Sequence, residues 1–379
     1  MQTYKGRKPL KPFAQYRAYR VRDLISRYAS LCKSTPLYRT GSSRMGAWRL
    51  RRIAWLLGGS LAVSMLVACE DSRHPAVRAV FADPPASQVS TAAREETRIT
   101  LVMKTLTNPF FVEMEQGARK FQNEVGIELL VKTATQETSI EQQIQLVNDA
   151  IKAQSRAIVI APGDSTRLVP SLKAAQDAGI HIVNLDNRLN SEAMVAAGMK
   201  PVPFISVDNE QGAYLAAKFL ADQVRTPSEA IIIEGIRTAD NAHQRKRGAE
   251  RGLHTNPGIR IVAEEAANWK IDEAYELTAR LFKQHPKVKL VFCANDMMAI
   301  GAIKYLQETG RTEVLVAGFD ALSDVMPAIR AGQLAATVDQ QAARQGYLGV
   351  STALQMLAGE MPAMEVTVDS KLVTARSLK

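Results

Sequence analysis

From residue 98 onward, short apolar runs rich in β-branched residues alternate with segments that carry apolar residues at helical spacing. The first runs are ITLVMK, IELLVK, AIVIAP, HIVNLD and FISVD, and helical segments span 110–124, 140–152 and 168–178. This alternation is typical of parallel sheets covered by helices, because parallel strands need a long crossover between them. The sequence therefore predicts an α/β fold with a doubly wound parallel sheet.

A second series with the same alternation follows. Its runs are AIIIEG, IRIVAE, KLVFCA and VLVAGFD, and its helical segments span 212–224, 242–254, 271–284 and 298–309. With 379 residues the chain is long enough for two cores, since domains of about 100 to 150 residues are commonest. The repetition predicts two doubly wound parallel-sheet lobes.

The end of the sequence indicates that the chain passes between these lobes more than once. After the run LAATVD, a helix pattern over 342–359 and a last run, KLVTA, indicate that the chain returns to cover the first sheet. We therefore expect a hinge of three crossings, near Val207, Gln340 and Asp369. The first lobe would comprise 98–207 plus 341–369, and the second 208–340 plus 370–379.

The segment before the first lobe differs from the rest in charge. Residues 1–68 hold fourteen Lys or Arg and one acid, Asp23, so they carry +13 of a chain total of +10 and leave −3 on residues 69–379. A protein that binds nucleic acid is expected to carry its basic surface on the folded domain itself. We therefore expect no nucleic-acid partner.

An uncharged apolar run of sixteen residues, IAWLLGGSLAVSMLVA, ends this basic leader. A membrane-spanning helix needs roughly 20 such residues, whereas a signal peptide carries about 7 to 15 behind a basic flank. The pattern favours export over permanent spanning. Met45 would give a leader of ordinary length, so translation of residues 1–44 stays open.

The apolar run closes with Leu66-Val67-Ala68-Cys69, which resembles the lipobox of bacterial lipoproteins. That resemblance implies that the thiol of Cys69 is acylated and that the protein is anchored to a membrane by lipid. An ordinary signal peptide followed by a chance Cys69 is the alternative. Residues 69–97 are rich in Pro, Ala and Ser, which indicates a tether between the anchor and the lobes.

The sequence shows none of the patterns that catalysis, metals or cofactors require. Cys32 and Cys69 precede the lobes, so Cys293 has no disulfide partner within them, and we expect it to be a buried small hydrophobe. The five His residues lack metal-ligand spacing, and there is no nucleophile elbow, phosphate loop or dinucleotide motif. We therefore expect no metal, no cofactor and no enzyme. The remaining catalytic option, a glycosidase pair of Asp186 and Asp320, would need carboxylates from opposite lobes, whose separation changes on closure.

Polar side chains follow the predicted strands, at the sheet edge where open parallel sheets bind ligands. These residues are Lys104, Asn108, Asp186, Asn187, Arg188, Asn295, Asp296, Asp320 and Gln340. Amides, carboxylates and a guanidinium such as that of Arg245 suit hydroxyls that both donate and accept, and aromatic rings suit the C–H face of a sugar. Phe110, Phe111 and Trp269 supply such rings.

Several of these residues also have an ordinary structural interpretation. Asn108 and Asp296 could simply cap the helices that follow them. Phe110 and Phe111 could belong to the core, and Arg245 to a solvated helix face.

Six short motifs taken together carry a family resemblance. They are TNPFF at 107–111, LD at 185–186, RKRG at 245–248, AND at 294–296, GFD at 318–320 and ATVDQ at 336–340. In order and spacing the chain resembles the ribose-binding proteins of bacterial ABC importers and the wider periplasmic sugar-binding family, from about Ile99 to Lys371. The resemblance implies the type I periplasmic binding protein fold, whose lobes close on a ligand about a hinge.

The resemblance also implies roles for individual residues. Asn108, Phe110 and Asp186 would face the ligand from the first lobe, and Arg245, Trp269, Asn295 and Asp320 from the second. Gln340 would reach in from the hinge, and Phe111 would pack on the sugar ring opposite Trp269.

Three positions depart from the ribose-binding pattern. Lys104 stands where ribose binders have a small hydroxyl side chain, Asn187 where they have Arg, and Trp269 where they have Phe. These changes put ribose itself in doubt. We hypothesise that Lys104 admits a carboxylate or a differently placed hydroxyl, and that Arg188 replaces the missing guanidinium only if its loop bends away from strand alternation.

The sequence thus predicts a solute-binding lipoprotein of the periplasm or the outer face of the cell membrane. It would capture a small sugar or polyol and deliver it to an ABC permease. The alternative is a ligand sensor that docks on a membrane sensor kinase or chemoreceptor. A transcription repressor with similar lobes would carry an N-terminal helix-turn-helix instead of an export segment.

Overall fold

The computed structural model describes residues 98–378, which all fall within one compact unit. The leader, the tether and Cys69 lie outside the described residues, so the export and lipidation predictions stay predictions. Within 98–378, no helix has the length and apolar character that crossing a membrane requires.

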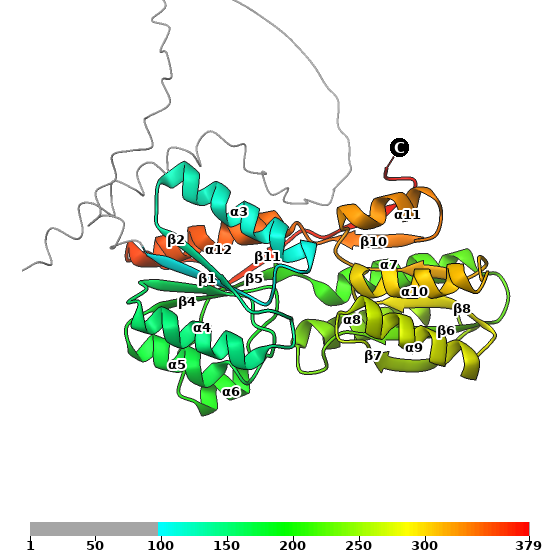
Figure 1. The fold of residues 1–379 in the computed structure, drawn as a ribbon, viewed down its shortest axis with the longest axis horizontal. Helices are drawn as coiled ribbons and strands as arrows, with labels where there is room; N and C mark the ends of the chain where they lie inside the picture. Colours follow the sequence, from blue (N-terminus) through cyan, green and yellow to red (C-terminus); the bar gives the residue numbers. More distant parts are fainter. Residues whose placement is uncertain (1–97, 379) are drawn as a thin grey trace, which may run out of the picture. The chain divides into compact units, whose positions relative to one another are not determined.

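The first lobe is a six-stranded, all-parallel sheet with strand order β11-β5-β4-β3-β1-β2 (Figure 1). Helices α3 and α12 pack on one face and α4 and α5 on the other, each pair over its own apolar cluster. The elements are β1(Ile99–Met103), α3(Pro109–Val125), β2(Leu129–Thr133), α4(Ile140–Lys152), β3(Ala157–Ile160), α5(Val169–Asp177), β4(His181–Leu185), α6(Ser191–Ala196), β5(Phe204–Val207), α12(Ala342–Leu357) and β11(Glu365–Val368).

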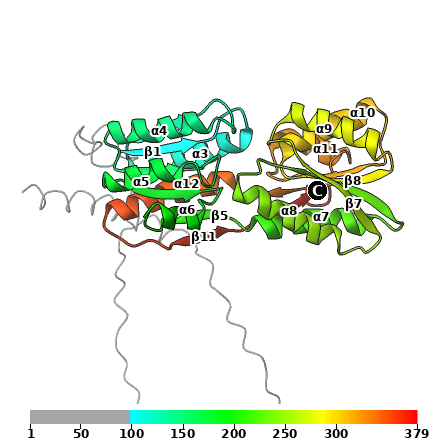
Figure 2. The same cartoon turned by 90° about the horizontal axis from the view of Figure 1, so that it is seen from below.

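The second lobe repeats this plan with strand order β12-β10-β9-β8-β6-β7, of which only β12 runs antiparallel. Figure 2 shows α9 and α10 on one side of this sheet and α7 and α8 on the other. The elements are α7(Asn209–Gln223), β6(Ser228–Glu234), α8(Asp240–Leu253), β7(Ile259–Ala266), α9(Ile271–Gln284), β8(Val288–Cys293), α10(Asp296–Glu308), β9(Leu315–Ala317), the short 3-10 helix η1(Ser323–Val325), α11(Met326–Arg330), β10(Ala336–Asp339) and β12(Lys371–Thr374).

The chain passes from one sheet to the other after β5, between β10 and α12, and between β11 and β12. The predicted fold of two doubly wound lobes is therefore confirmed. The final run KLVT forms β12 in the second sheet, inside the 370–379 assigned to the second lobe, so it does not itself help to cover the first sheet. The strand that returns to the first sheet is β11, which the sequence analysis missed because this edge strand is largely exposed and lacks an apolar run.

Glycine lets α7 and α8 approach closely and so fixes where α8 lies. A Cβ atom added at Gly248 would lie 2.1 Å from the backbone oxygen of Glu210, and one at Gly252 would lie 2.6 Å from that of Tyr214. Neither distance is possible for real atoms, so any larger residue would push α8 away from α7. This crossing matters because α8 carries residues of the site described next.

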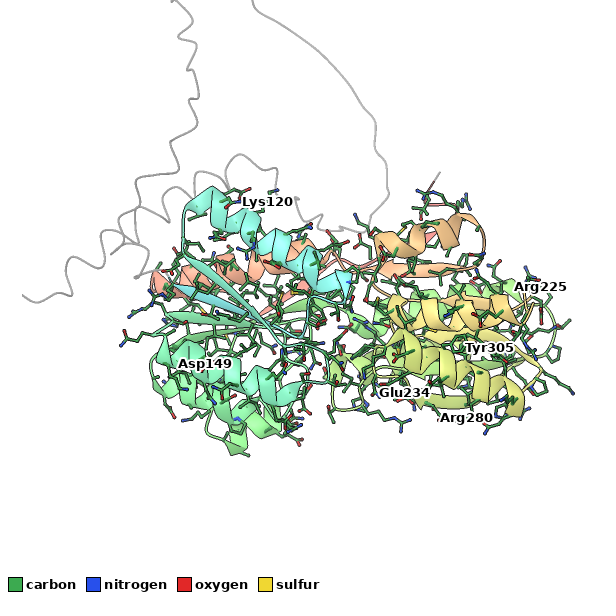
Figure 3. All side chains as sticks on the ribbon, in the orientation of Figure 1. Lys120, Asp149, Arg225, Glu234, Arg280 and Tyr305 are labelled. Atoms are coloured by element: carbon green, nitrogen blue, oxygen red, sulfur yellow. The ribbon has the colours of Figure 1, made fainter. Side chains whose placement is uncertain are left out.

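Charged side chains lie mainly on the outer surfaces of the helices. Figure 3 labels Lys120 on α3 and Asp149 on α4, whose side chains are 70% and 53% exposed. Cys293 is fully buried at the end of β8, as expected of a small hydrophobe, and burial raises the pKa of its thiol.

Candidate ligand-binding site

A cavity lies where the carboxyl ends of the two sheets meet, with about 230 Å³ of empty space, part of which is open to solvent. Ten of the predicted site residues line it, together with Glu137 and Asn241: the ten are Lys104, Asn108, Phe110, Phe111, Asp186, Arg245, Trp269, Asn295, Asp320 and Gln340.

Lys104 follows β1 and lies among acidic and aromatic groups. Its Nζ is 2.8 Å from the Asp186 carboxylate, 3.9 Å from that of Glu137 and 5.4 Å from the centre of the Phe111 ring. Lys104 and Asp186 are each only 2% exposed. The charge of Lys104 is therefore compensated by protein groups, mainly by Asp186.

Asn108 both caps a helix and lines the cavity, so its two interpretations hold together. Its Oδ1 accepts a hydrogen bond from the Phe110 N–H at the start of α3, and its Nδ2 donates to Glu137 Oε1 at 2.9 Å. Burial raises the pKa of Glu137, against the opposing effects of Lys104 and Asn108. Asn295 makes a similar helix cap in the second lobe, where its Oδ1 accepts a hydrogen bond from the Met298 N–H at the start of α10.

Three aromatic rings form the apolar wall of the cavity. Phe110 and Phe111 meet edge to face with ring centres 5.0 Å apart and are almost completely buried, so they serve the core and the cavity at once. Trp269 has a left-handed backbone (φ 68°), and a Cβ atom at Gly235 would lie 2.0 Å from its ring. Glycine at 235 is therefore what leaves room for the indole.

Arg245 is a buried cation held in one orientation by several neighbours. Its Nε donates to Asn209 Oδ1 at 2.9 Å, and one terminal nitrogen donates to the Ala294 carbonyl at 2.8 Å. The same nitrogen is 3.5 Å from Asp320, and the guanidinium stacks 3.9 Å from the Phe319 ring centre. Burial lowers the pKa of Arg245, while Asp320 and Asp186 oppose that shift.

Asp320 and Gln340 connect the second lobe to the hinge. Gln340 Nε2 donates to Asp320 Oδ1 at 2.5 Å. Burial raises the pKa of Asp320 well above its ordinary value, although Arg245 counteracts the effect. Asp320 has a positive φ of 118°, a conformation that is strained for a residue with a side chain and is common at functional sites.

Several buried polar atoms of the cavity wall have no hydrogen-bond partner within residues 98–378. They are Oδ1 of Asn241, Nε1 of Trp269 and Oε1 of Gln340, besides Oδ2 of Asp186, which is ion-paired with Lys104 at 2.8 Å. Buried polar groups in native proteins are nearly always paired, so an orphaned set around one cavity needs an explanation. A small molecule that offers both donors and acceptors would satisfy the indole N–H and the two amide oxygens together.

Comparison with known proteins identifies the fold family. A family model described as a periplasmic binding protein domain matches residues 99–361. The chain belongs to the periplasmic binding protein family. The D-ribose/D-allose-binding protein of Pseudomonas aeruginosa is 39% identical to it over 298 residues, which cover 77% of this chain and 93% of that protein. The ribose import binding protein of Escherichia coli is 30% identical over 285 residues, 75% of this chain and 93% of that protein.

Solved structures give the same result. An ABC transporter periplasmic solute-binding protein from Actinobacillus succinogenes with bound D-allose superposes with a TM-score of 0.70 at 36% identity, covering 73% of this chain and 97% of that one. The named relatives are transport-binding proteins rather than enzymes, so this periplasmic binding protein is not an enzyme. Within 98–378, no cluster of three or more His, Cys, Asp or Glu is placed to hold a metal ion.

Three residues that follow the strands of this periplasmic binding protein lie outside the cavity wall: Asn187, Arg188 and Asp296, the last buried at the start of α10. Asn187 is completely buried, and its Nδ2 donates to the Pro162 carbonyl at 3.0 Å. Arg188 is turned away: its guanidinium pairs with Glu365 at 2.6 Å and stacks 4.0 Å from the Phe204 ring centre. Arg188 therefore does not supply the missing cavity guanidinium.

The sequence analysis missed two cavity residues, Glu137 and Asn241. Glu137 lies in the loop after β2, several residues beyond the strand end, and a search limited to the first positions after each strand passes over it. Asn241 lies four residues before Arg245 on α8, and residues at that spacing share a helix face. Helical spacing from Arg245 was thus an available signal.

The two lobes are in direct contact at the cavity. Asn241 Nδ2 from the second lobe donates to Asp186 Oδ1 of the first lobe at 3.3 Å. A backbone bond joins Ser165 N–H to the Thr238 carbonyl at 3.0 Å. The structure is therefore a closed form, in which residues from both lobes surround one small volume.

Proposed function

We propose that the protein is an exported solute-binding protein that captures a small neutral sugar of the ribose and allose type. The unpaired donor and acceptors around a cavity with aromatic walls carry this proposal. A sugar offers hydroxyls to the unpaired polar atoms and C–H faces to the aromatic rings. The names of the relatives support the same ligand class.

Charge balance supports a neutral sugar over a sugar acid. The cavity holds the cations Lys104 and Arg245 and the acids Glu137, Asp186 and Asp320. Lys104 is already paired with Asp186, and Arg245 already contacts Asp320. A carboxylate in the ligand would enter without a free cation and beside a further acid, at a cost in desolvation. Of the two roles considered for Lys104, the differently placed hydroxyl is therefore favoured.

A thermal-shift screen tests the ligand class. We expect D-allose or D-ribose to raise the melting temperature, because a ligand that binds only the folded state stabilises it by RT ln(1 + [L]/Kd). Hexuronic acids and linear polyols at equal concentration are the controls. A larger shift with a sugar acid, or none with any aldose, would show that the proposal is wrong.

We further propose that the closed, loaded form delivers its sugar to the permease of an ABC importer. The family and the named relatives support this role. A deletion strain should lose uptake of the labelled sugar and regain it with the wild-type gene. Unchanged uptake combined with a lost transcriptional or chemotactic response to the sugar would indicate the sensor role instead.

Acylation of Cys69 is proposed from the sequence alone. A Cys69→Ser variant should move from the membrane fraction to the soluble fraction and lose incorporation of labelled fatty acid. Equal membrane association of both forms would contradict a lipid anchor at this position.

A further inference from the structure

Helix α8 begins at Asp240 without a capping side chain of its own. The residue in the N-cap position is Ala239, which makes no side-chain cap bond. The first backbone N–H groups of any α-helix lack partners within the helix and are normally satisfied by a Ser, Thr, Asp or Asn at the N-cap. The partners of Asp240 and Asn241 must therefore come from elsewhere in the protein.

Those partners come from the other lobe. The Asp240 N–H donates to Ser165 Oγ at 3.0 Å, and the Asn241 N–H donates to Asn187 Oδ1 at 3.2 Å. Ser165 lies in the loop after β3, and Asn187 follows β4, both in the first lobe. Two side chains of one lobe thus cap a helix of the other.

The two capping residues are built into the first lobe by further bonds. The Ser165 hydroxyl donates to Asn187 Oδ1 at 3.4 Å, and Asn187 Nδ2 donates to the Pro162 carbonyl at 3.0 Å. The exposed fractions are 6% for Ser165 and 0% for Asn187, and neither lines the 230 Å³ cavity. Their contacts point to an effect on closure instead of contact with the ligand.

We propose that Ser165 and Asn187 are positioning residues that cap α8 across the cleft and so set the free energy of closure. The cap can form only when the lobes are closed, and opening leaves both N–H groups to water. Closure by this route also fixes the first turns of α8, which carry Asn241 and Arg245 in the cavity wall. The inference rests on the proposed function, since it concerns closure around the same ligand.

A residue that acts on closure alone affects every ligand equally. The apparent affinity of each ligand is its intrinsic affinity multiplied by the fraction of protein in the closed form. A residue that touches the ligand instead changes the ratio between the affinities of two ligands. This difference separates a cap across the cleft from an undetected ligand contact.

Ser165→Ala and its matched control Ser165→Thr test the cap from the first lobe. Calorimetry with D-allose and D-ribose should give dissociation constants about five-fold higher in Ser165→Ala, the typical effect of losing a cap, and near the wild-type value in Ser165→Thr. The ratio of the two constants should not change. Unchanged constants, or a changed ratio, would overturn the proposal.

Asp240→Pro tests the same bond from the second lobe. Proline removes the N–H at the first position of α8, where its fixed φ is compatible with a helix start, and Asp240→Ala is the control that keeps the N–H. Asp240→Pro should weaken binding much more than Asp240→Ala. In the Ser165→Ala background Asp240→Pro should weaken binding little further, because both changes remove the same hydrogen bond. Full additivity would contradict the shared cap.

A measurement of closure without sugar separates this inference from the ligand assignment. Dyes placed through Lys120→Cys and Arg225→Cys, with Cys32→Ser and Cys69→Ser, report the distance between lobes by energy transfer (Figure 3). If neither sugar binds the wild-type protein, the proposed ligand class fails. The ligand-free comparison still decides the cap: a smaller closed fraction in Ser165→Ala than in Ser165→Thr supports it, and equal fractions overturn it.

Discussion

Lys104 and Asp186 form an ion pair in the cavity wall, with Nζ 2.8 Å from the carboxylate and both side chains 2% exposed. Removing two charges from water is costly, and their attraction repays that cost only while both remain. Each residue therefore stabilises the other in its buried position. The pair also fixes the edge of the cavity where the chain departs from the ribose-binding pattern.

Loss of one partner of this pair should destabilise the protein strongly. We expect Lys104→Met to lower the free energy of unfolding by about 3 to 5 kcal/mol, because Asp186 is left as an unpaired buried charge. The double variant Lys104→Met with Asp186→Asn should recover most of that loss, as urea denaturation would show. Lys218→Met breaks an exposed pair with Asp222 and should lower the free energy of unfolding far less than Lys104→Met does. If the loss in free energy of unfolding of the double variant equals the sum of the two single losses, Lys104 and Asp186 do not stabilise each other.

Arg245 should be essential for binding through its shape as well as its charge. Lysine keeps the charge but cannot bond Asn209 and the Ala294 carbonyl together while stacking on Phe319. We expect Arg245→Lys to weaken sugar binding by about 2 to 4 kcal/mol, since buried polar groups lose their partners. Arg247→Lys is the matched control, because Arg247 is 53% exposed and pairs with Glu210. Calorimetry that finds wild-type affinity in Arg245→Lys would show that the guanidinium is not part of the binding site.

The fold was predictable because the interior parallel strands are buried on both faces and read as continuous apolar runs. Strands β1, β3 and β5 are buried along their whole length, and the sequence analysis found all three. Edge position removes that signal from β11, and the six-residue α6 buries no residue at all, so neither stands out by periodicity.

The candidate site was predictable where a residue lies at the first or second position after a strand, as Lys104, Asp186 and Asn295 do. What the sequence could not give is the direction of a side chain after the strand ends. Asp186 has a positive φ of 60°, and the next residue, Asn187, turns toward the other lobe and not toward the cavity. Such a turn depends on tertiary bonds, which no local pattern records.

A smaller ring at position 269 should compensate for the loss of stability caused by a larger residue at Gly235. A methyl group in Gly235→Ala would meet the indole ring at 2.0 Å, so the ring must move and the cavity wall must change shape. Overpacking of this kind costs about 1 to 3 kcal/mol, and we expect weaker sugar binding as well as a lower melting temperature. Adding Trp269→Phe, which removes the ring atoms nearest to Gly235, should restore stability in the double variant. A double variant no more stable than Gly235→Ala would contradict this contact as the cause.

Asp296 should make the protein less stable as the pH rises toward neutrality. It is completely buried at the start of α10, where its carboxylate accepts from the Thr337 hydroxyl at 2.7 Å and from the Leu322 N–H at 2.9 Å. Burial raises its pKa to about 7, from an ordinary value of 3.8. The folded protein therefore binds one more proton than the unfolded chain between these two values, and stability falls with pH across that window.

Denaturation of wild-type protein and Asp296→Asn at pH 5 and pH 8 measures this contribution. One pKa unit corresponds to about 1.4 kcal/mol. Between these pH values the free energy of unfolding should therefore fall by up to about 3 kcal/mol more in the wild-type protein than in Asp296→Asn. Burial also raises the pKa of Glu137 and Asp320, which both remain in the variant, and the charge of Asp296 adds to the rise in the pKa of Asp320, so the difference between the curves reports Asp296 together with its effect on Asp320. Asp149→Asn on the outer face of α4 serves as the control and should follow the wild-type dependence. Parallel curves for wild type and Asp296→Asn would mean that Asp296 is ionised in the folded protein throughout this range.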